Sequence, residues 1–166
     1  RHQVDITGLI GQYAHGNEPS HHMAYLYNYI NKPWKSQERI AQILSEMYSN
    51  TPDGLSGNED CGQMSSWYVL SAMGIYSVTP GLDYYTIGSP RLNKAIINLE
   101  NGNQFKIIAH GASKDNMYIK SALLNGESFN RSYIYHSEIM NGGILEFEMS
   151  PEPNKLWASL DSNLPI

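Results

Sequence analysis

Three histidines and a carboxylate gather in one short loop near the start of the chain, and they are the first sign of chemistry in the sequence. A zinc site could be built from His15, Glu18 and His22, but zinc hydrolases of this kind place two histidines four residues apart on one helix. Pro19 interrupts any such helix, so zinc is the lower-ranked hypothesis. Asn17 and Glu18 offer oxygen atoms, which suit a polyhydroxylated ligand or a hard cation such as Ca²⁺. Another interpretation places Pro19 in a first helical turn, with the histidines capping or packing.

A second polar loop holds Asn58, Glu59 and Asp60 between two glycines, directly before a predicted helix. The EF-hand pattern of alternating acids with a distal glutamate is missing there. In one interpretation Asp60 caps the helix and Glu59 is a solvated loop charge. In the other, Asp60 is an ionised carboxylate, stabilised by the helix dipole, that acts as a general base. An inverting glycoside hydrolase needs such a base to deprotonate its attacking water.

Composition narrows the classes of function. The 166 residues carry a net charge of −5, which argues against a reader of nucleic-acid backbones and against a helix lying on an anionic membrane. No apolar stretch approaches the ~20 residues that span a bilayer. The content of 12 Tyr and 3 Trp suits sugar binding. The single cysteine, Cys61, has no evident base partner, and a buried structural thiol is predicted.

The spacing of apolar and turn residues predicts an α+β chain, with a helical segment at 1–78 and a β-rich segment at 79–166. A capping box of Asp60 and Gln63 is predicted to start the third helix, and Gly74 to end it. The expected helices are 20–30, 34–47 and 60–73. The expected strands are 94–99, 104–109, 118–124, 133–135 and 143–149. Three helices do not bury their apolar faces alone, so we expect a larger helical array beside a small antiparallel sheet or sandwich.

Within these helices, apolar residues recur at helical spacing. The first helix has one such face, the second has a predicted buried stripe, and the third is lined by aromatic residues that are more typical of a core than of a ligand platform. These residues are Met23, Leu26, Tyr27 and Ile30 in the first; Ile40, Ile43, Leu44 and Met47 in the second; and Met64, Trp67, Tyr68 and Ser71 in the third.

Two long strings carry a family resemblance: residues 5–22, DITGLIGQYAHGNEPSHH, and residues 58–69, NEDCGQMSSWYV. They closely resemble glycoside hydrolase family 92, whose members are exo-acting, calcium-dependent α-mannosidases best known for releasing α-1,2-linked mannose from N-glycans and mannans. The likeness continues through GIYSV at 74–78 and IGSP at 87–90, so it covers most of the chain.

This resemblance implies C-terminal helices of an (α/α)-barrel catalytic domain, with an upstream β-sandwich and the remaining barrel helices as partners within the parent chain. It implies an inverting mechanism with Asp60 as the base, while the catalytic acid lies upstream of Arg1. Some members carry a second acid where this chain has Asn58. Glu18 and Asp60 are the implied Ca²⁺ ligands. The implied sugar-binding residues are His15, Asn17, Glu18, His22, Asn58 and Glu59.

The resemblance also implies mannose-containing glycans as ligands and a secreted, periplasmic or cell-surface location in a glycan-degrading bacterium. Because the acid of the catalytic pair is missing, the chain alone is expected to be inactive. The competing hypothesis is a non-catalytic carbohydrate-binding or scaffold module that uses the strand half and its tyrosines.

Overall fold

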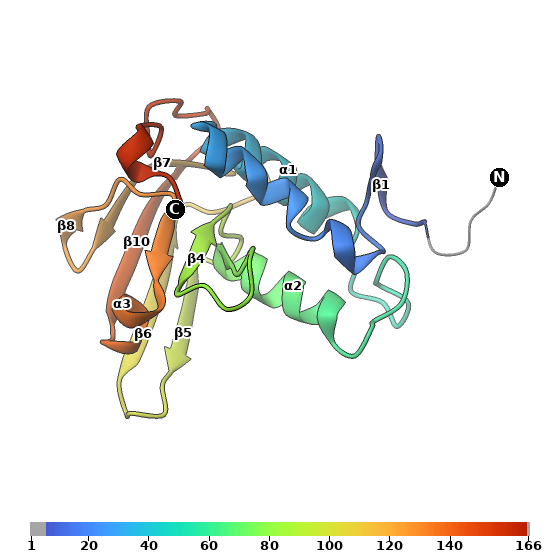
Figure 1. Cartoon of the computed structure of the whole chain (residues 1–166), viewed down its shortest axis with the longest axis horizontal. Helices are drawn as coiled ribbons and strands as arrows, with labels where there is room; N and C mark the ends of the chain where they lie inside the picture. Colours follow the sequence, from blue (N-terminus) through green and yellow to red (C-terminus); the bar gives the residue numbers. More distant parts are fainter. Residues whose placement is uncertain (1–5, 166) are drawn as a thin grey trace.

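A layer of helices packs beside a twisted β-sheet in the computed structural model of the chain, which describes residues 6–165 (Figure 1). Residues 1–5, including Asp5 of the family-like string, lie outside the described part. The helices are η1 (Glu18–Ser20), η2 (Met23–Ile30), α1 (Pro33–Glu46), α2 (Gln63–Met73), α3 (His136–Met140) and η3 (Asp161–Asn163), where η denotes a 3₁₀ helix. The mixed α+β class is therefore confirmed.

The strands follow the predicted pattern of short segments between turns. They are β1 (Leu9–Ile10), β2 (Tyr13–Ala14), β3 (Ile75–Tyr76), β4 (Tyr84–Ile87), β5 (Lys94–Asn98), β6 (Gln104–His110), β7 (Tyr118–Leu124), β8 (Glu127–Ser128), β9 (Tyr133–Tyr135) and β10 (Gly143–Ser150). All five predicted strands are present, and β7 and β9 have the predicted bounds. Tight turns at Asn101-Gly102 and Asn125-Gly126 separate neighbouring strands, with both Asn125 and Gly126 at positive φ.

Sheet topology differs in one respect from the all-antiparallel expectation. The larger sheet has the order β5-β6-β10-β7-β8, and β10 runs parallel to β6 but antiparallel to β7. β10 reaches this central place after the chain has crossed through β9 and α3, and its direction is then opposite to that of β7. Its inward residues Leu145 and Phe147 are fully buried. A smaller sheet, β3-β4-β9, joins residues on both sides of the predicted boundary at 78/79.

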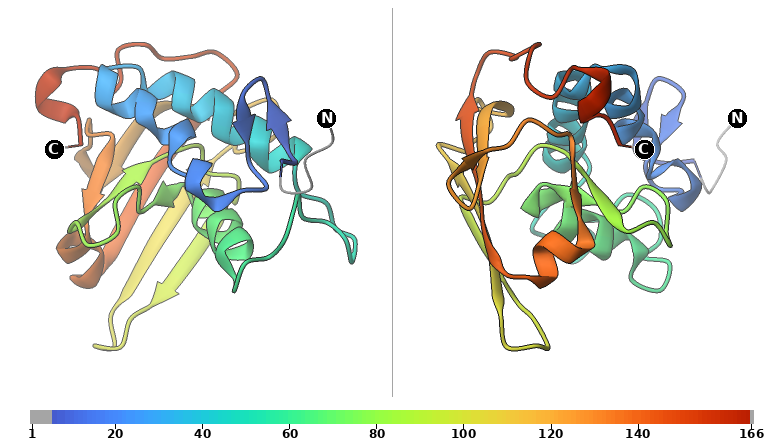
Figure 2. Two further views of the ribbon diagram at one scale, coloured as in Figure 1. Left: turned by 45° about the vertical axis from the view of Figure 1, so that its right-hand side comes forward. Right: turned by 60° about the vertical axis from the view of Figure 1, so that its left-hand side comes forward.

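Buried amide side chains connect the helices to the sheets. Asn28 on η2 donates to the carbonyls of Ile87 and Ser132, at 2.8 and 3.2 Å. Gln37 on α1 accepts from the backbone N–H of Ile119 on β7, at 3.0 Å. Both amide side chains are almost completely buried, so these bonds are costly to lose and fix the helical layer on the β-rich half. The views in Figure 2 show α1 and α2 lying along one side of the sheet.

The second helix has the core that was predicted, and the third has it except for Tyr68, which is exposed. Ile40, Ile43, Leu44 and Met47 are buried, and Trp67 is fully buried. The first helix is different because it is a 3₁₀ helix, in which every third residue shares a face. Tyr25 and Asn28 therefore share a buried face, and the small Ala24 beside them is buried as well.

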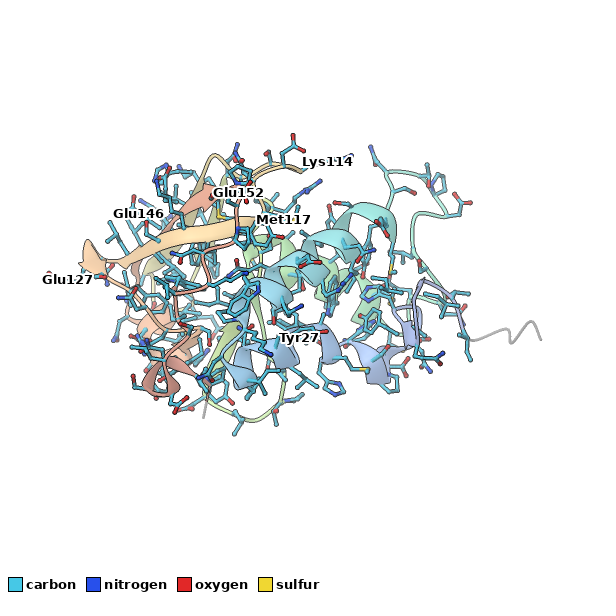
Figure 3. All side chains as sticks on the ribbon, turned by 90° about the horizontal axis from the view of Figure 1, so that it is seen from above. Tyr27, Lys114, Met117, Glu127, Glu146 and Glu152 are labelled. Atoms are coloured by element: carbon cyan, nitrogen blue, oxygen red, sulfur yellow. The ribbon has the colours of Figure 1, made fainter. Side chains whose placement is uncertain are left out.

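The predicted face of that first helix points outward instead. Met23, Leu26 and Ile30 are 45%, 43% and 56% exposed, and Tyr27 is half-buried. Tyr27 is labelled on η2 in Figure 3. These residues line an open hollow of about 410 Å³ with Ile10 and Tyr13. The four predicted residues do lie together on one apolar face, but no other part of the described chain covers that face.

Candidate functional site

The two candidate loops lie at the end of the helical half that is farthest from the large sheet, on the right of Figure 1. Gly16 packs directly against the second loop: a Cβ atom there would lie 2.0 Å from Thr7 Oγ1 and 3.0 Å from the Ser56 carbonyl oxygen. Gly57 packs in return, with its Cβ position 2.5 Å from the Gly16 carbonyl oxygen. Glycine at both positions permits this close backbone contact, which brings the two loops together.

His15 is fully buried at this contact, and protein groups occupy both of its ring nitrogens. The Tyr13 hydroxyl lies 2.7 Å from Nδ1, and the Tyr48 hydroxyl lies 2.6 Å from Nε2. Because Tyr48 donates to the Met64 carbonyl at 3.2 Å, it accepts from His15, which then accepts from Tyr13. Burial, with a smaller effect of nearby His21, lowers the pKa of His15 to about 3. The ring is therefore neutral, and its predicted contact with a sugar stays a prediction.

His21 connects the first loop to the start of α2. Its Nε2 donates to the His15 carbonyl at 2.9 Å, and its Nδ1 accepts from the Gln63 amide at 3.0 Å. The Trp67 indole donates to the His21 carbonyl at 3.0 Å. Burial lowers the pKa of His21, against the opposing effects of the His15 carbonyl and of the Glu18 and Asp60 charges. Two carboxylates from different loops therefore act on one buried imidazole.

The other predicted ligands, Glu59 apart, reach the surface of the molecule. Asn17, Glu18, Asn58 and Asp60 are exposed, and His22 is half-buried. Asn17 precedes η1 without a side-chain cap bond. The structure thus separates the predicted residues into a buried support, which includes His15, and an exposed set of oxygen-bearing side chains. Such a set can bind hydroxyl groups or a hard cation and can accept a proton.

Asp60 does not cap α2, so the predicted capping box is wrong. The helix begins at Gln63, with Gly62 as its N-cap, and the three preceding residues Asp60, Cys61 and Gly62 all have left-handed φ values of 51°, 56° and 92°. This left-handed turn places Asp60 outside the helix. It also exposes Cys61, which contradicts the prediction of a buried thiol.

Glu59 supports the first turn of α2 in place of Asp60. Its carboxylate accepts from the backbone N–H of Ser65 at 2.9 Å and from the Ser65 hydroxyl at 2.8 Å. Such bonds stabilise a helix start because the first N–H groups have no partner within the helix. Glu59 is therefore more than a solvated loop charge, and its sugar contact stays a prediction.

The donor set fits calcium in kind but not in number. Ca²⁺ takes six to eight oxygen ligands. Glu18 and Asp60 supply carboxylate oxygens, but within residues 6–165 no group of three or more His, Cys, Asp and Glu side chains could hold a metal ion. Further oxygens would have to come from carbonyls, water, the sugar or other parts of the parent enzyme. The zinc hypothesis is weakened further because both nitrogens of His15 are already engaged.

A hollow beside α2 does not include the two carboxylates among its lining residues. It has a volume of about 450 Å³ and lies between the turn after α1 and the outer face of α2. Tyr48, Thr51, Ser65 and Tyr68 are among its lining residues, but Glu18 and Asp60 are not. Neither carboxylate lines this hollow or the hollow beside η2, and both are exposed to solvent.

Sequence reasoning missed the residues that support the site. Tyr13 and His15 are two residues apart, and this spacing in an extended segment places them on one face. Gln63 was assigned to a capping box, whereas its amide contacts His21 and the Tyr76 hydroxyl, the latter at 3.3 Å. Nothing in the sequence indicates Tyr48, because its contact with His15 spans 33 residues.

The competing hypothesis requires tyrosines of the strand half that are open to a sugar, but several of these tyrosines pack against one another. Tyr84 and Tyr133 are buried and pack edge to face, and Tyr133 also packs edge to face on Tyr135. Arg131 lies over the rings of Tyr133 and Tyr135. This arrangement resembles a packed aromatic cluster more than a flat platform for a sugar ring.

Comparison with known proteins places this chain among the glycoside hydrolases. Residues 1–151 match the glycosyl hydrolase family 92 catalytic domain. The chain is 30% identical to a secreted glycosidase of Arthroderma benhamiae, covering 90% of this chain and 20% of that protein. No helix among residues 6–165 is long and apolar enough to cross a membrane.

Solved structures of family 92 enzymes also resemble this chain. A family 92 α-mannosidase of Bacteroides thetaiotaomicron, solved with mannoimidazole, superposes with a TM-score of 0.94 at 45% identity, over 98% of this chain and 21% of that one. An inverting family 92 mannosidase of the same organism gives 0.88 at 43% identity, over 93% and 21%. The chain belongs to glycosyl hydrolase family 92. It spans about a fifth of the length of these relatives.

Proposed function

We propose that this chain is part of the catalytic domain of an inverting exo-α-mannosidase that acts on α-1,2-linked mannose of N-glycans or mannans. The observation that carries the proposal is the close packing of two loops at Gly16 and Gly57, one of which carries the exposed carboxylate of Glu18 and the other that of Asp60. The relatives described as α-mannosidases, one of them in complex with mannoimidazole, support mannose as the sugar.

In this proposal Asp60 is the general base. Its exposed carboxylate stands just before the N-terminus of α2, where the helix dipole stabilises negative charge. It takes a proton from the water that attacks the anomeric carbon, while an acid from another part of the parent enzyme protonates the leaving oxygen. The left-handed turn at Asp60 matters because it keeps the carboxylate outside the helix and open to solvent.

The remaining exposed groups bind the sugar. Asn17, Asn58 and His22 carry donors and acceptors that suit mannose hydroxyls. We assign to Glu18 and Asp60 the carboxylate oxygens of a Ca²⁺ site that is completed outside this chain. When bound, the cation would contact adjacent sugar hydroxyls and help to distort the ring toward the transition state.

The uncovered apolar face of η2 fits a piece of a larger (α/α)-barrel. Met23, Leu26 and Ile30 are all exposed on this face, and contiguous exposed apolar residues commonly mark an interaction surface. We assign this face to packing against the preceding barrel helices of the parent enzyme. A secreted, periplasmic or cell-surface enzyme is proposed because one relative is named a secreted glycosidase.

The test is hydrolysis of an α-1,2-mannobioside followed by proton NMR. A full-length family 92 enzyme that contains this chain should release mannose whose first-formed anomer is β, because inversion changes the configuration of the α-linked sugar. The 166-residue chain alone should release none. First-formed α-mannose from the full-length enzyme, or turnover by the chain alone, would contradict the proposal.

A further inference from the structure

Hydrogen bonds that run from Gln63 to His21 and from His21 to His15 connect the two candidate loops. Gln63 follows Asp60 by three residues, and His21 follows Glu18 by three residues. The Gln63 amide donates to His21 Nδ1 at 3.0 Å, and His21 Nε2 donates to the His15 carbonyl at 2.9 Å. Two hydrogen bonds therefore span the distance from the turn that carries one carboxylate to the turn that carries the other.

The direction of each bond is fixed by chemistry. A carbonyl oxygen only accepts, so the hydrogen of the His21 ring must be on Nε2. Nδ1 then has a lone pair and accepts from the Gln63 amide, whose second hydrogen faces the Tyr76 hydroxyl at 3.3 Å. A single neutral tautomer of His21 satisfies all of these contacts at once, so the connection has one arrangement.

The surroundings hold this connection rigid. His21 is 1% exposed, and its carbonyl accepts from the Trp67 indole at 3.0 Å. The His15 and His21 rings stack with centroids 4.7 Å apart, and His15 also packs edge-on to Trp67 at 4.4 Å. Because buried rings at packing contact cannot move independently, a shift at one loop has to displace the other.

We infer that Gln63 and His21 are positioning residues that set the separation of the Glu18 and Asp60 carboxylates. This inference rests on the proposed function, since the separation matters where both carboxylates serve one sugar. Neither side chain needs to touch the substrate. Their loss would move the carboxylates relative to each other, and misplacement of about 1 Å can cost about 10²-fold in rate.

The test is Gln63→Leu in a full-length family 92 enzyme that contains this chain. The substitution keeps the side-chain bulk and removes both amide donors. We expect kcat to fall by roughly 10- to 100-fold with KM changed by less than about threefold, because ground-state contacts with the sugar are retained. The matched control is Gln42→Leu, the same change on α1, where Gln42 contacts Arg39 and Glu46 instead. The control should keep the parent kcat.

Gln63→Glu is a second variant for the case in which Gln63→Leu fails to fold. It keeps the side-chain size but replaces the donating amide by a carboxylate, and the same loss in kcat is expected. Imidazole ¹⁵N NMR of the parent protein gives a readout besides activity: His21 should be one neutral tautomer with hydrogen on Nε2. An equal mixture of tautomers, or kcat values equal to the Gln42→Leu control, would overturn the inference. If no variant and no parent enzyme hydrolyses α-mannosides, the proposed function fails, while the tautomer still tests the connection.

Discussion

Acid should destabilise this chain through His15, and the effect can be measured in isolation. The pKa of His15 in the folded chain is about 3, against an ordinary value of 6.5, because the ring is buried and His21 is close by. Above pH 6.5 both the folded and the unfolded chain carry a neutral His15, so the residue adds no pH dependence. Below that pH the unfolded chain binds a proton that the folded chain excludes. The free energy of unfolding therefore falls as the pH drops from 6.5 toward 3.

The magnitude follows from the linkage of one proton. Each pH unit in this window costs about 1.4 kcal/mol, so lowering the pH from about 7 to about 5 removes roughly 2 kcal/mol through His15. His15→Gln removes the titrating group. Its unfolding free energy should be lower than that of the parent near pH 7, but its loss on going to pH 5 should be smaller by roughly 2 kcal/mol.

Urea unfolding of the purified chain at several pH values is the assay, with Tyr48→Phe as the matched control. That variant removes the hydroxyl that accepts from His15 Nε2 but leaves the ring buried. Its free energy of unfolding should be about 1–3 kcal/mol lower than that of the parent at every pH, and should depend on pH as that of the parent does. If His15→Gln loses as much free energy between pH 7 and pH 5 as the parent does, the low pKa of His15 is refuted.

Three further changes test the packing around the site by urea unfolding. Gly16→Ala should cost about 1–3 kcal/mol, because its Cβ would lie 2.0 Å from Thr7 Oγ1, and adding Thr7→Ala should restore part of the loss. Glu59→Gln should cost about 1 kcal/mol, since a neutral amide replaces the carboxylate that accepts twice from Ser65. Asn28→Ala should cost about 2–4 kcal/mol, because it leaves two buried carbonyls of the β-rich half without their donor.

Each of these three has an outcome that would contradict it. If the unfolding free energy of Gly16→Ala is within about 0.5 kcal/mol of that of the parent, the two loops can separate freely. Glu59→Gln should exceed the effect of Glu100→Gln in an exposed turn, and equal effects would argue against a role in supporting α2. Asn28→Asp should cost at least as much as Asn28→Ala, because it places acceptor oxygens opposite the two carbonyls. An Asn28→Ala variant whose unfolding free energy stays within about 0.5 kcal/mol of the parent would contradict the role of this side chain.

Regular local patterns were predictable, and packing between distant segments was not. β7 was predicted with its observed bounds because turn residues flank it on both sides. The core of α1, with Ile40 and Ile43, followed from helical spacing. η2 was misassigned because a spacing of about 3.6 residues and a spacing of three coincide over short stretches. The place of β10 between β6 and β7 depends on partners that no local pattern names.

The candidate site was half predictable for the same reason. Glu18 and Asp60 were identified by residue type and family resemblance, and the structure packs the two loops that carry them against each other. The left-handed turn at Asp60 and Cys61 was missed, because positive φ is uncommon outside glycine and two such residues in succession have no local sequence signal. The supporting contacts of His15 with Tyr48 and of His21 with Gln63 span 33 and 42 residues, and only the fold shows them.

The most direct test of the central proposal is the turnover of Asp60→Asn in a full-length family 92 enzyme that contains this chain. The asparagine keeps the size of the side chain but cannot take a proton from water. If Asp60 is the base, kcat on an α-1,2-mannobioside should fall by about 10²–10⁴ while mannose still binds with a similar Kd. If kcat stays within about tenfold of the parent, Asp60 is not the base of this enzyme.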